Sequence, residues 1–277
     1  MAMTVTVVGL GLIGASLAKA IKQRTDNTVI GIDINGEVTN KALLEGTIDK
    51  IGSAEDLRNT DLTIVSLYPA AAADFVKSNA DKFKKGSVVT DTCGIKEKIC
   101  DELVDFSHEN GFEFIGAHPM AGKEKFGYDY SEATLFDNAY MILTPVDADE
   151  NNVDMLRELS QKIGFKGVTV STPAEHDRII AYTSQIPHVL ACAYVSDPDA
   201  VLHNGFSAGS YKDISRVADI NARLWQELFI ENSRQLVGHI DILINNLQNI
   251  KQLIENRDND ELCAVLQKAR DTKAKIG

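Results

Sequence analysis

The sequence predicts an α/β N-terminal domain followed by an all-α C-terminal domain. Short apolar runs alternate with helical patterns up to residue 170, a capped helix begins directly afterwards, and no convincing strand follows it. Strands separated by helices are typical of βαβ units with a mostly parallel sheet. A chain of 277 residues has room for two domains of about 150 residues each. We therefore expect domains at residues 1–171 and 172–277.

The strands expected in the first half are short β-branched or apolar runs. They cover residues 5–8, 28–32, 62–67, 87–91, 112–117, 140–143 and 168–170. A helical stretch at 15–23 follows the first of them. Ser53 and Asp56 have the spacing of a capping box, which predicts a short helix there.

The second half is predicted to be helical. A strong helix start combines an N-cap at Thr172, a proline in the first turn at Pro173 and an acidic third position at Glu175. Breaks between helices are expected at 196–199 and 204–210. From Asn221 onward, apolar residues recur every three or four positions, which predicts one helix about 50 Å long. Its residues 236, 240, 243, 247, 250 and 254 form a heptad seam. This helix is either the core of one bundle or shared between two subunits.

Composition excludes several classes of protein. Lys and Arg number 28 against 40 Asp and Glu, a net charge of −12, which argues against nucleic-acid or anionic-membrane binding. The four cysteines form no CxxC pair and no zinc spacing, so we expect no metal, and a reduced, cytoplasmic protein. The N-terminus lacks a basic signal-peptide segment, and no apolar run reaches 18 residues.

A glycine turn follows the first predicted strand. Gly9-x-Gly11-x-x-Gly14 would give a tight turn, a close approach to a pyrophosphate and close helix–strand packing, respectively. The backbone N–H groups of Leu12 and Ile13 would face the phosphates at the helix start. This pattern predicts a Rossmann-type dinucleotide-binding domain.

Asp33 lies 19 residues after Gly14, at the end of the second predicted strand. A carboxylate there accepts hydrogen bonds from the adenosine ribose and repels a 2′-phosphate. No arginine stands at Ile34 or Asn35 to offset that repulsion. The expected cofactor is therefore NAD rather than NADP. Cys93 and Gly94 follow strand 87–91, which places them near the nicotinamide at the same edge of the sheet.

A histidine follows the predicted strand 112–117. His118 begins the small-residue loop HPMAG, at the edge where open α/β sheets bind ligands. Imidazole is well suited to accept a hydroxyl proton near neutral pH. His118 is a candidate base, with an ordinary loop histidine as the alternative.

Three polar residues interrupt the apolar helix expected over 179–195 and the turn before it. His176, Ser184 and His188 can share one side of this helix at about 100° per residue, and Pro187 should kink it. They are either pocket residues or satisfied polar groups of the core.

Arg216 follows the glycine-rich break that includes Gly209. Its guanidinium can hold a carboxylate through two hydrogen bonds, so Arg216 is a candidate anion clamp. The alternative is a surface salt bridge.

These segments, in this order, resemble the prephenate/arogenate dehydrogenase family over nearly the whole chain. The resemblance is carried by GLGLIGASLAKAI, DTCGIKEKI, GAHPMAGKEKFGYDYSEATLF, AEHDRIIAYTSQIPHVLA and GSYKDISRVADINARLWQELFIEN. It implies oxidation of a cyclohexadienol that bears a ring carboxylate. Hydride leaves ring C4 for NAD, the 4-hydroxyl loses its proton, and CO2 leaves C1.

The resemblance also implies roles for individual residues. His118 matches the base, and Arg216, after Gly209, matches the arginine that binds a substrate carboxylate. Ser184 and His188 match polar residues of the substrate pocket, and His176 with Asp177 matches the HD pair ahead of them. Family members are typically homodimers with intertwined helical domains.

One departure from the family concerns Gly94, where many members carry a serine whose hydroxyl lies near the reacting oxygen. The leading hypothesis is an NAD-dependent prephenate dehydrogenase that makes 4-hydroxyphenylpyruvate. Arogenate as substrate, a β-hydroxyacid or imine reductase, and an NAD-binding sensor without turnover are the alternatives. The histidines and Arg216 argue against a sensor, which needs no base.

Overall fold

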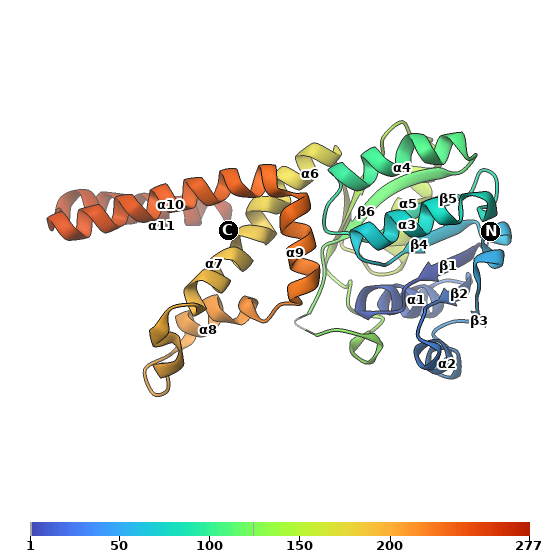
Figure 1. Cartoon of the computed structure of the whole chain (residues 1–277), viewed down its shortest axis with the longest axis horizontal. Coiled ribbons are helices and arrows are strands. Elements are labelled where there is room, and N and C mark those ends of the chain that lie inside the picture. Colours follow the sequence, from blue (N-terminus) through green and yellow to red (C-terminus); the bar gives the residue numbers. More distant parts are fainter. Residues whose placement is uncertain (1, 124) are drawn as a thin grey trace.

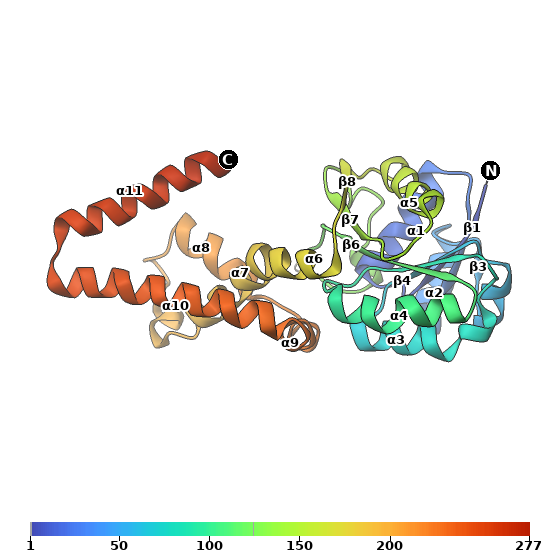
Figure 2. The same ribbon diagram turned by 90° about the horizontal axis from the view of Figure 1, so that it is seen from above.

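The computed structural model describes residues 2–123 and 125–277. Figures 1 and 2 show a sheet region, β1 to β8, from which a helical region, α6 to α11, extends to one side. The α/β and all-α fold classes expected from the sequence are confirmed. No helix in the described ranges is long and apolar enough to cross a membrane.

The strands of the described chain form one eight-stranded sheet in the order β3-β2-β1-β4-β5-β6-β7-β8. All neighbouring pairs are parallel except β6 and β7, which run antiparallel. The strands are β1 (Thr4–Val8), β2 (Thr28–Ile32), β3 (Lys50–Ile51), β4 (Leu62–Val65), β5 (Val88–Asp91), β6 (Glu113–Pro119), β7 (Tyr140–Thr144) and β8 (Gly167–Val170). Every predicted strand is present, and the two-residue β3 was not predicted.

Helices cover both faces of this sheet, as its apolar strands require. Side chains of α1 and α5 pack in one core cluster, and side chains of α3 and α4 pack in the other. The helices of the sheet region are α1 (Leu12–Arg24), α2 (Gly36–Leu44), α3 (Pro69–Ser78), α4 (Glu97–Glu109) and α5 (Glu150–Lys162), with short 3-10 turns η1 (Ala54–Asn59), η2 (Ala80–Lys82) and η3 (Tyr128–Tyr130). The predicted capping-box helix is η1, in which Ser53 N donates to Asp56 Oδ2 at 2.9 Å.

The helical region begins as predicted. Thr172 Oγ1 accepts from Glu175 N at 3.2 Å, and Pro173 occupies the first turn of α6. The elements are α6 (Pro173–Ile180), the π-helix η4 (Ala181–Gln185), α7 (Ile186–Val195), η5 (Pro198–Leu202), α8 (Gly209–Ser215), η6 (Arg216–Ala218), α9 (Ala222–Glu231), α10 (Ser233–Asn256) and α11 (Asn259–Ile276).

The prediction of one helix of about 50 Å from Asn221 is wrong. Asn232 separates α9 from α10, and α10 alone spans 24 residues, or about 36 Å. The side chain of Asn232 is buried, and its Nδ2 donates to Asp177 O and to Gln185 Oε1, both at 2.9 Å. The break lets this amide reach two acceptors on α6 and η4. Apolar periodicity did not reveal it, because the spacing continues across a single irregular residue.

Candidate active site

The glycine turn between β1 and α1 has three separate geometric requirements. Gly9 has φ +86°, a conformation that side-chain-bearing residues rarely adopt. A Cβ on Gly14 would lie 1.9 Å from Gly9 O, so close packing of the helix on the turn requires glycine there. A Cβ on Gly11 would meet nothing within 4 Å, which leaves open space beside the backbone.

This open space lies at the N-terminus of α1. No side chain caps the first turn of α1, where Leu12 and Ile13 stand. Its N–H groups therefore suit an anion. Asp33 fixes the turn, because its Oδ2 accepts from Leu10 N at 2.7 Å and its Oδ1 accepts from Asn35 N at 2.8 Å.

A cavity of about 390 Å³ joins this turn to the helical region. Its lining combines the glycine turn, the ends of β4, β5 and β6, the loop after β6, and side chains of η4 and α9. Seven predicted site residues line it: Gly11, Leu12, Ile13, Cys93, Gly94, His118 and Ser184. Both regions thus contribute to one cavity.

Six predicted site residues are not among the described lining of this cavity: Gly9, Gly14, Asp33, His188, Gly209 and Arg216. The first three shape or flank the glycine turn. The other three belong to α7, α8 and η6 in the helical region. Glu124, which follows Lys123 in the sequence, lies outside the described residues.

His118 lies at the end of β6 and faces the helical region. Its Nδ1 is 2.9 Å from Nε2 of His176 on α6, and Nδ1 of His176 is 2.7 Å from Asp177 Oδ1. Burial, followed by electrostatic repulsion from His176 and Lys96 when His118 takes up a proton, holds the pKa of His118 well below its ordinary 6.5. Burial also lowers the pKa of His176, although Asp177 opposes this shift. Both imidazoles are therefore neutral near pH 7.

A buried ion pair holds the strand ends next to His118. Lys96 Nζ donates to Asp91 Oδ2, and both side chains are at most 1% exposed. The other oxygen of Asp91 accepts from Ala117 N at 3.0 Å, which ties β5 to β6. Burial is the largest single influence and disfavours the charge on Lys96, but the attraction of Asp91 and smaller contributions together raise the lysine pKa.

Sequence reasoning missed the Asp91–Lys96 pair. Its signal was a buried strand ending in aspartate, with a lysine five residues later in the small-residue segment DTCGIK. Neither residue lines the cavity among the described residues. Their contribution is to fix the backbone that carries Gly94 and His118.

Ser184 lies in the π-helix η4. Pro187 follows in the first turn of α7 and has no N–H for a carbonyl of the preceding turn, which accounts for the changed hydrogen-bond ladder. His188, one turn beyond Ser184, packs behind Trp225 of the lining. Its Nδ1 donates to Val217 O at 2.7 Å, and its ring centroid is 3.8 Å from that of Trp225. His188 thus holds η6, which begins at the exposed Arg216.

Cys93 and Gly94 lie beneath the cavity at the end of β5. Cys93 is buried, and burial raises the pKa of its thiol well above 9.0, so it remains protonated. Gly94 has no positive φ. A Cβ there would lie 3.4 Å from Leu228 and 3.9 Å from Cε1 of His118, which are ordinary contacts.

Comparisons with known proteins agree on one family. Residues 17–169 match the family described as prephenate dehydrogenase, nucleotide-binding domain, and residues 172–268 match prephenate dehydrogenase, dimerization domain. The prephenate dehydrogenase of Bacillus subtilis strain 168 is 30% identical over 97% of this chain and 74% of its own length.

Solved structures are similar over the full chain. The prephenate dehydrogenase of A. aeolicus, in complex with hydroxyphenyl propionate and NAD+, matches with a TM-score of 0.89 and 26% identity, covering 100% of this chain and 99% of that one. Synechocystis arogenate dehydrogenase matches with a TM-score of 0.84 and 27% identity, covering 99% and 100%. These relatives include enzymes named for either substrate.

Proposed function

Since the chain belongs to the prephenate dehydrogenase family, we propose that it is an oxidoreductase that converts prephenate and NAD to 4-hydroxyphenylpyruvate, CO2 and NADH. One observation carries the proposal: the half-buried imidazole of His118 lines the same cavity as the glycine turn. A hydroxyl base and a dinucleotide cradle therefore face each other, as hydride abstraction from an alcohol carbon requires.

The residues of the β1–α1 turn fit a dinucleotide. Open space at Gly11 and an uncapped helix start would receive the pyrophosphate, while Asp33 would accept from the ribose. Both oxygens of Asp33 already accept one backbone hydrogen bond, but a carboxylate has about four acceptor sites, which leaves capacity for the ribose. When bound, NAD supplies the hydride acceptor.

His118 acts as the base. Because burial keeps its imidazole neutral near pH 7, it can accept the 4-hydroxyl proton as hydride leaves C4. Electrons of the C1–carboxylate bond then make the ring aromatic as CO2 departs, and the phenol oxygen regains a proton. Ser184, which lines the cavity from η4, contacts the substrate. Arg216 holds a substrate carboxylate from the start of η6, where His188 holds the carbonyl of Val217.

The cavity favours prephenate over arogenate. Its described lining contains Lys123 and Lys125 and no carboxylate side chain. Arogenate carries an ammonium group where prephenate carries a keto group, and a buried ammonium needs an acidic partner. Lys123 is paired with Glu132 at 2.7 Å, so Lys125 is the remaining lysine of this lining, and the lining suits an anionic keto acid better than an ammonium group.

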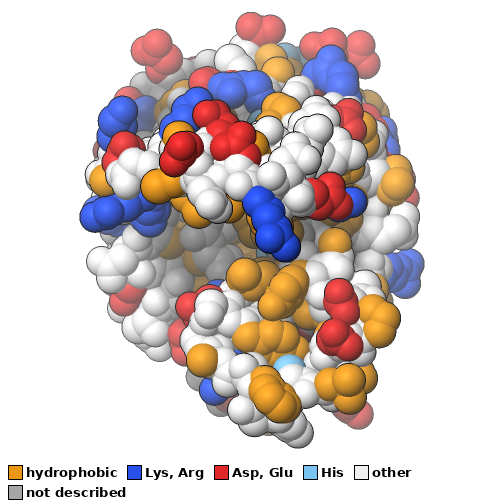
Figure 3. Space-filling view, turned by 90° about the vertical axis from the view of Figure 1, so that its left-hand side faces the viewer, with side chains coloured by type: hydrophobic (Ala, Val, Ile, Leu, Met, Phe, Trp, Pro, Cys, Tyr) orange, Lys and Arg blue, Asp and Glu red, His pale blue; other side chains and the backbone are white. Residues whose placement is uncertain are grey.

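The helical region mediates a homodimer. Only Leu236 is buried in the 24 residues of α10, and none of the described side chains of α11 is buried. Leu247, Ile254 and Leu266 are 53%, 58% and 56% exposed, a large apolar face for a single subunit. Apolar side chains also gather on the lower part of the end face in Figure 3. Phe206, between η5 and α8, is 93% exposed. A second copy would cover such surfaces.

Absorbance of NADH tests the proposed function. The purified chain is mixed with NAD and prephenate, then with NAD and arogenate, and then with NADP and prephenate. We expect the highest kcat/KM for NAD with prephenate. A higher value with arogenate would reassign the substrate, and binding of NAD without turnover of either substrate would favour a sensor.

A further inference from the structure

Three side chains form a hydrogen-bonded chain between the two regions. His118 comes from β6, whereas His176 and Asp177 come from α6. His176 and Asp177 are each 2% exposed, and the two histidine contacts measure 2.9 and 2.7 Å. In the described lining of the cavity, only His118 of the three is present. His176 and Asp177 therefore act through it.

Asp177 determines the direction of these hydrogen bonds. Its Oδ1 accepts from Lys96 N at 2.7 Å, and its Oδ2 accepts from Glu97 N at 2.8 Å, at the start of α4. These contacts leave the carboxylate as an acceptor toward His176, so Nδ1 of His176 carries a proton and donates it. Because His176 is neutral, its Nε2 is an acceptor. His118 must then donate from Nδ1, and its own Nε2 keeps a lone pair.

We propose that Asp177 and His176 are positioning residues that hold His118 in the Nδ1–H tautomer and leave its Nε2 to accept the substrate proton. A carboxylate that fixes the tautomer of a catalytic imidazole has this role in Ser-His-Asp triads. Here a second imidazole extends the arrangement. The inference rests on the proposed function only where it assigns the base to His118.

This arrangement makes the base depend on contact between the regions. The N-cap position of α4, Lys96, makes no side-chain capping bond of its own, and Asp177 caps the helix from across the boundary. The carboxylate that docks α6 on α4 thus also sets the proton position on His118. If Asp177 served only to cap α4, the site would need Asp177 but not His176. An effect of substitutions at His176 on His118 therefore distinguishes the proposed positioning role from a purely structural one.

Histidine tautomers are measured directly by nitrogen NMR of the whole protein labelled with ring-15N histidine. The His118 signals are assigned by their loss in His118→Asn. We expect Nδ1 of His118 to be protonated and Nε2 to be unprotonated at pH 7.5, without substrate. His176→Leu removes the acceptor and should give a mixture of tautomers, whereas His176→Gln offers an amide oxygen and should restore part of the Nδ1–H form.

Kinetics provide the second readout. His176→Leu should lower kcat by about 10- to 100-fold, as loss of orienting partners does, while the Kd for NAD stays within twofold. His176→Gln should recover part of kcat. Asp177→Asn should lower kcat at least as much, but it also alters the cap of α4, so its melting temperature is compared.

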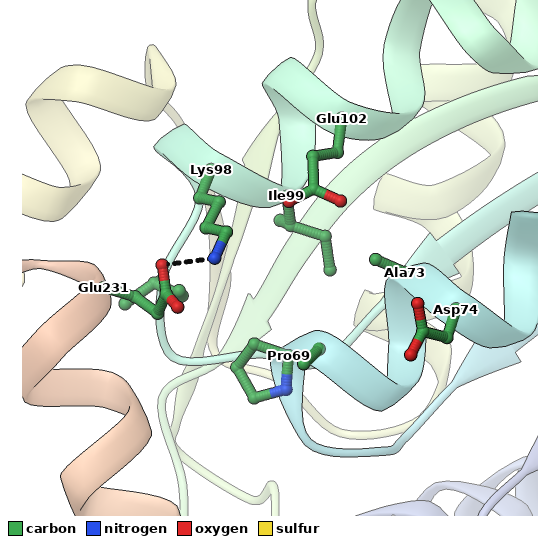
Figure 4. Close-up of a pocket in the computed structure, with 9 residues that line it drawn as sticks. Pro69, Ala73, Asp74, Lys98, Ile99, Glu102 and Glu231 are labelled. Atoms are coloured by element: carbon green, nitrogen blue, oxygen red, sulfur yellow. Dashed lines mark ion pairs between the residues drawn. The ribbon is translucent and has the colours of Figure 1, made fainter.

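Glu231→Gln is the matched control. Figure 4 shows Glu231 paired with Lys98 of α4 at a smaller cavity of about 160 Å³, and their charged atoms are 2.6 Å apart. This substitution weakens another contact across the same boundary without touching the histidines. It should leave both the tautomer and kcat unchanged.

The outcomes separate two possible errors. Protonation of Nε2 rather than Nδ1 of His118 in the unmutated protein would overturn the inference, as would an unaltered tautomer in His176→Leu. Neither result affects the proposed function, since the spectra need no turnover. The expected tautomer together with an active His118→Asn enzyme would instead remove His118 as the base.

Discussion

In the sheet region, Val5, Leu103 and Phe114 are fully buried, whereas Leu247, Ile254 and Leu266 of the helical region leave more than half of their surface exposed. The sheet region has two apolar core clusters, one for each face of the sheet. The helical region buries few apolar side chains: Ile180, Ala181, Ala191, Leu228 and Leu236 are its described examples. The sheet region can therefore hold its shape through its own core. The helical region depends on what it contacts.

This difference suggests a division of roles. The sheet region carries the proposed base and the glycine turn at its strand ends, where a buried ion pair fixes the backbone. The helical region carries the candidate substrate clamp and the surface for a second subunit. Substitutions at the strand ends of the sheet region should mainly change kcat or cofactor choice. Substitutions from α7 to α11 should change substrate KM or assembly, whereas His176 and Asp177 of α6 should affect kcat through His118.

The largest effect is expected at His118. His118→Asn keeps a hydrogen-bonding side chain but loses basicity, so kcat should fall by about 10²–10⁴-fold with little change in NAD affinity. In the unmutated enzyme, kcat/KM should fall only at pH values below 6.5, because burial depresses the imidazole pKa. A rate within threefold of the parent, measured as NADH formation, would exclude His118 as the base.

The same depressed pKa links pH to folding. Unfolding lets His118 take up a proton below the ordinary value of 6.5, while the folded protein keeps it neutral. The free energy of unfolding should therefore decrease as pH falls through this range. In denaturant titrations, His118→Asn should reduce this dependence.

Assembly is the sharpest test of the helical region. Leu243→Arg introduces a charge into the apolar seam of α10 and should weaken the dimer by about 10²-fold or more. Asn245→Arg adds the same charge about 200° away around the helix and serves as the control. Sedimentation at micromolar concentration measures both. An unmutated protein that sediments as an active monomer would contradict the division of roles.

Arg216 tests the substrate side of the comparison. Arg216→Ala should raise the prephenate KM by about 10- to 100-fold without changing the Kd for NAD, and Arg216→Lys should recover only part, because the planar fork is lost. Arg223→Ala removes an exposed arginine from α9 and should change neither value. Equal weakening of prephenate and NAD binding by Arg216→Ala would indicate a role in folding.

Cofactor choice tests the sheet region. Asp33→Ser with Ile34→Arg should reduce the preference for NAD over NADP by about tenfold or more, since one charge-assisted hydrogen bond is exchanged for a phosphate contact. The arginine is placed at Ile34 rather than at Asn35, because Ile34 is fully exposed whereas the side chain of Asn35 caps α2. Asp33 also holds Leu10 N, so the ratio of kcat/KM for the two cofactors is the informative value. Ile34→Arg alone is the control.

The sequence predicted most of the elements that local patterns determine. Buried strands, the glycine turn and the Thr172 cap follow from short motifs, and the structure contains them. It did not predict the break at Asn232 or the chain from His118 to Asp177. Both depend on contacts between residues more than fifty positions apart, which no local spacing records. Sequence spacing grouped His188 with Ser184, but the π-helix and Trp225 give the two side chains different neighbours.

Gly94 should show the smallest effect and therefore tests how much space the cavity leaves. Its backbone needs no positive φ, and a new Cβ would make ordinary contacts with Leu228 and His118. Gly94→Ser should therefore fold normally, bind NAD with unchanged Kd, and keep kcat within about threefold or improve it, because the hydroxyl can donate to the substrate oxygen next to His118.

Gly14→Ser is the contrasting variant, since its Cβ would lie 1.9 Å from a backbone oxygen and should abolish NAD binding or folding. Both variants are compared by melting temperature and NAD titration. If Gly94→Ser lost NAD affinity as Gly14→Ser does, glycine would be required at 94 for close approach of the cofactor. The absence of a serine hydroxyl at position 94 would then follow from the space that NAD needs there. His118 would have to orient the substrate oxygen without a hydrogen bond from the end of β5.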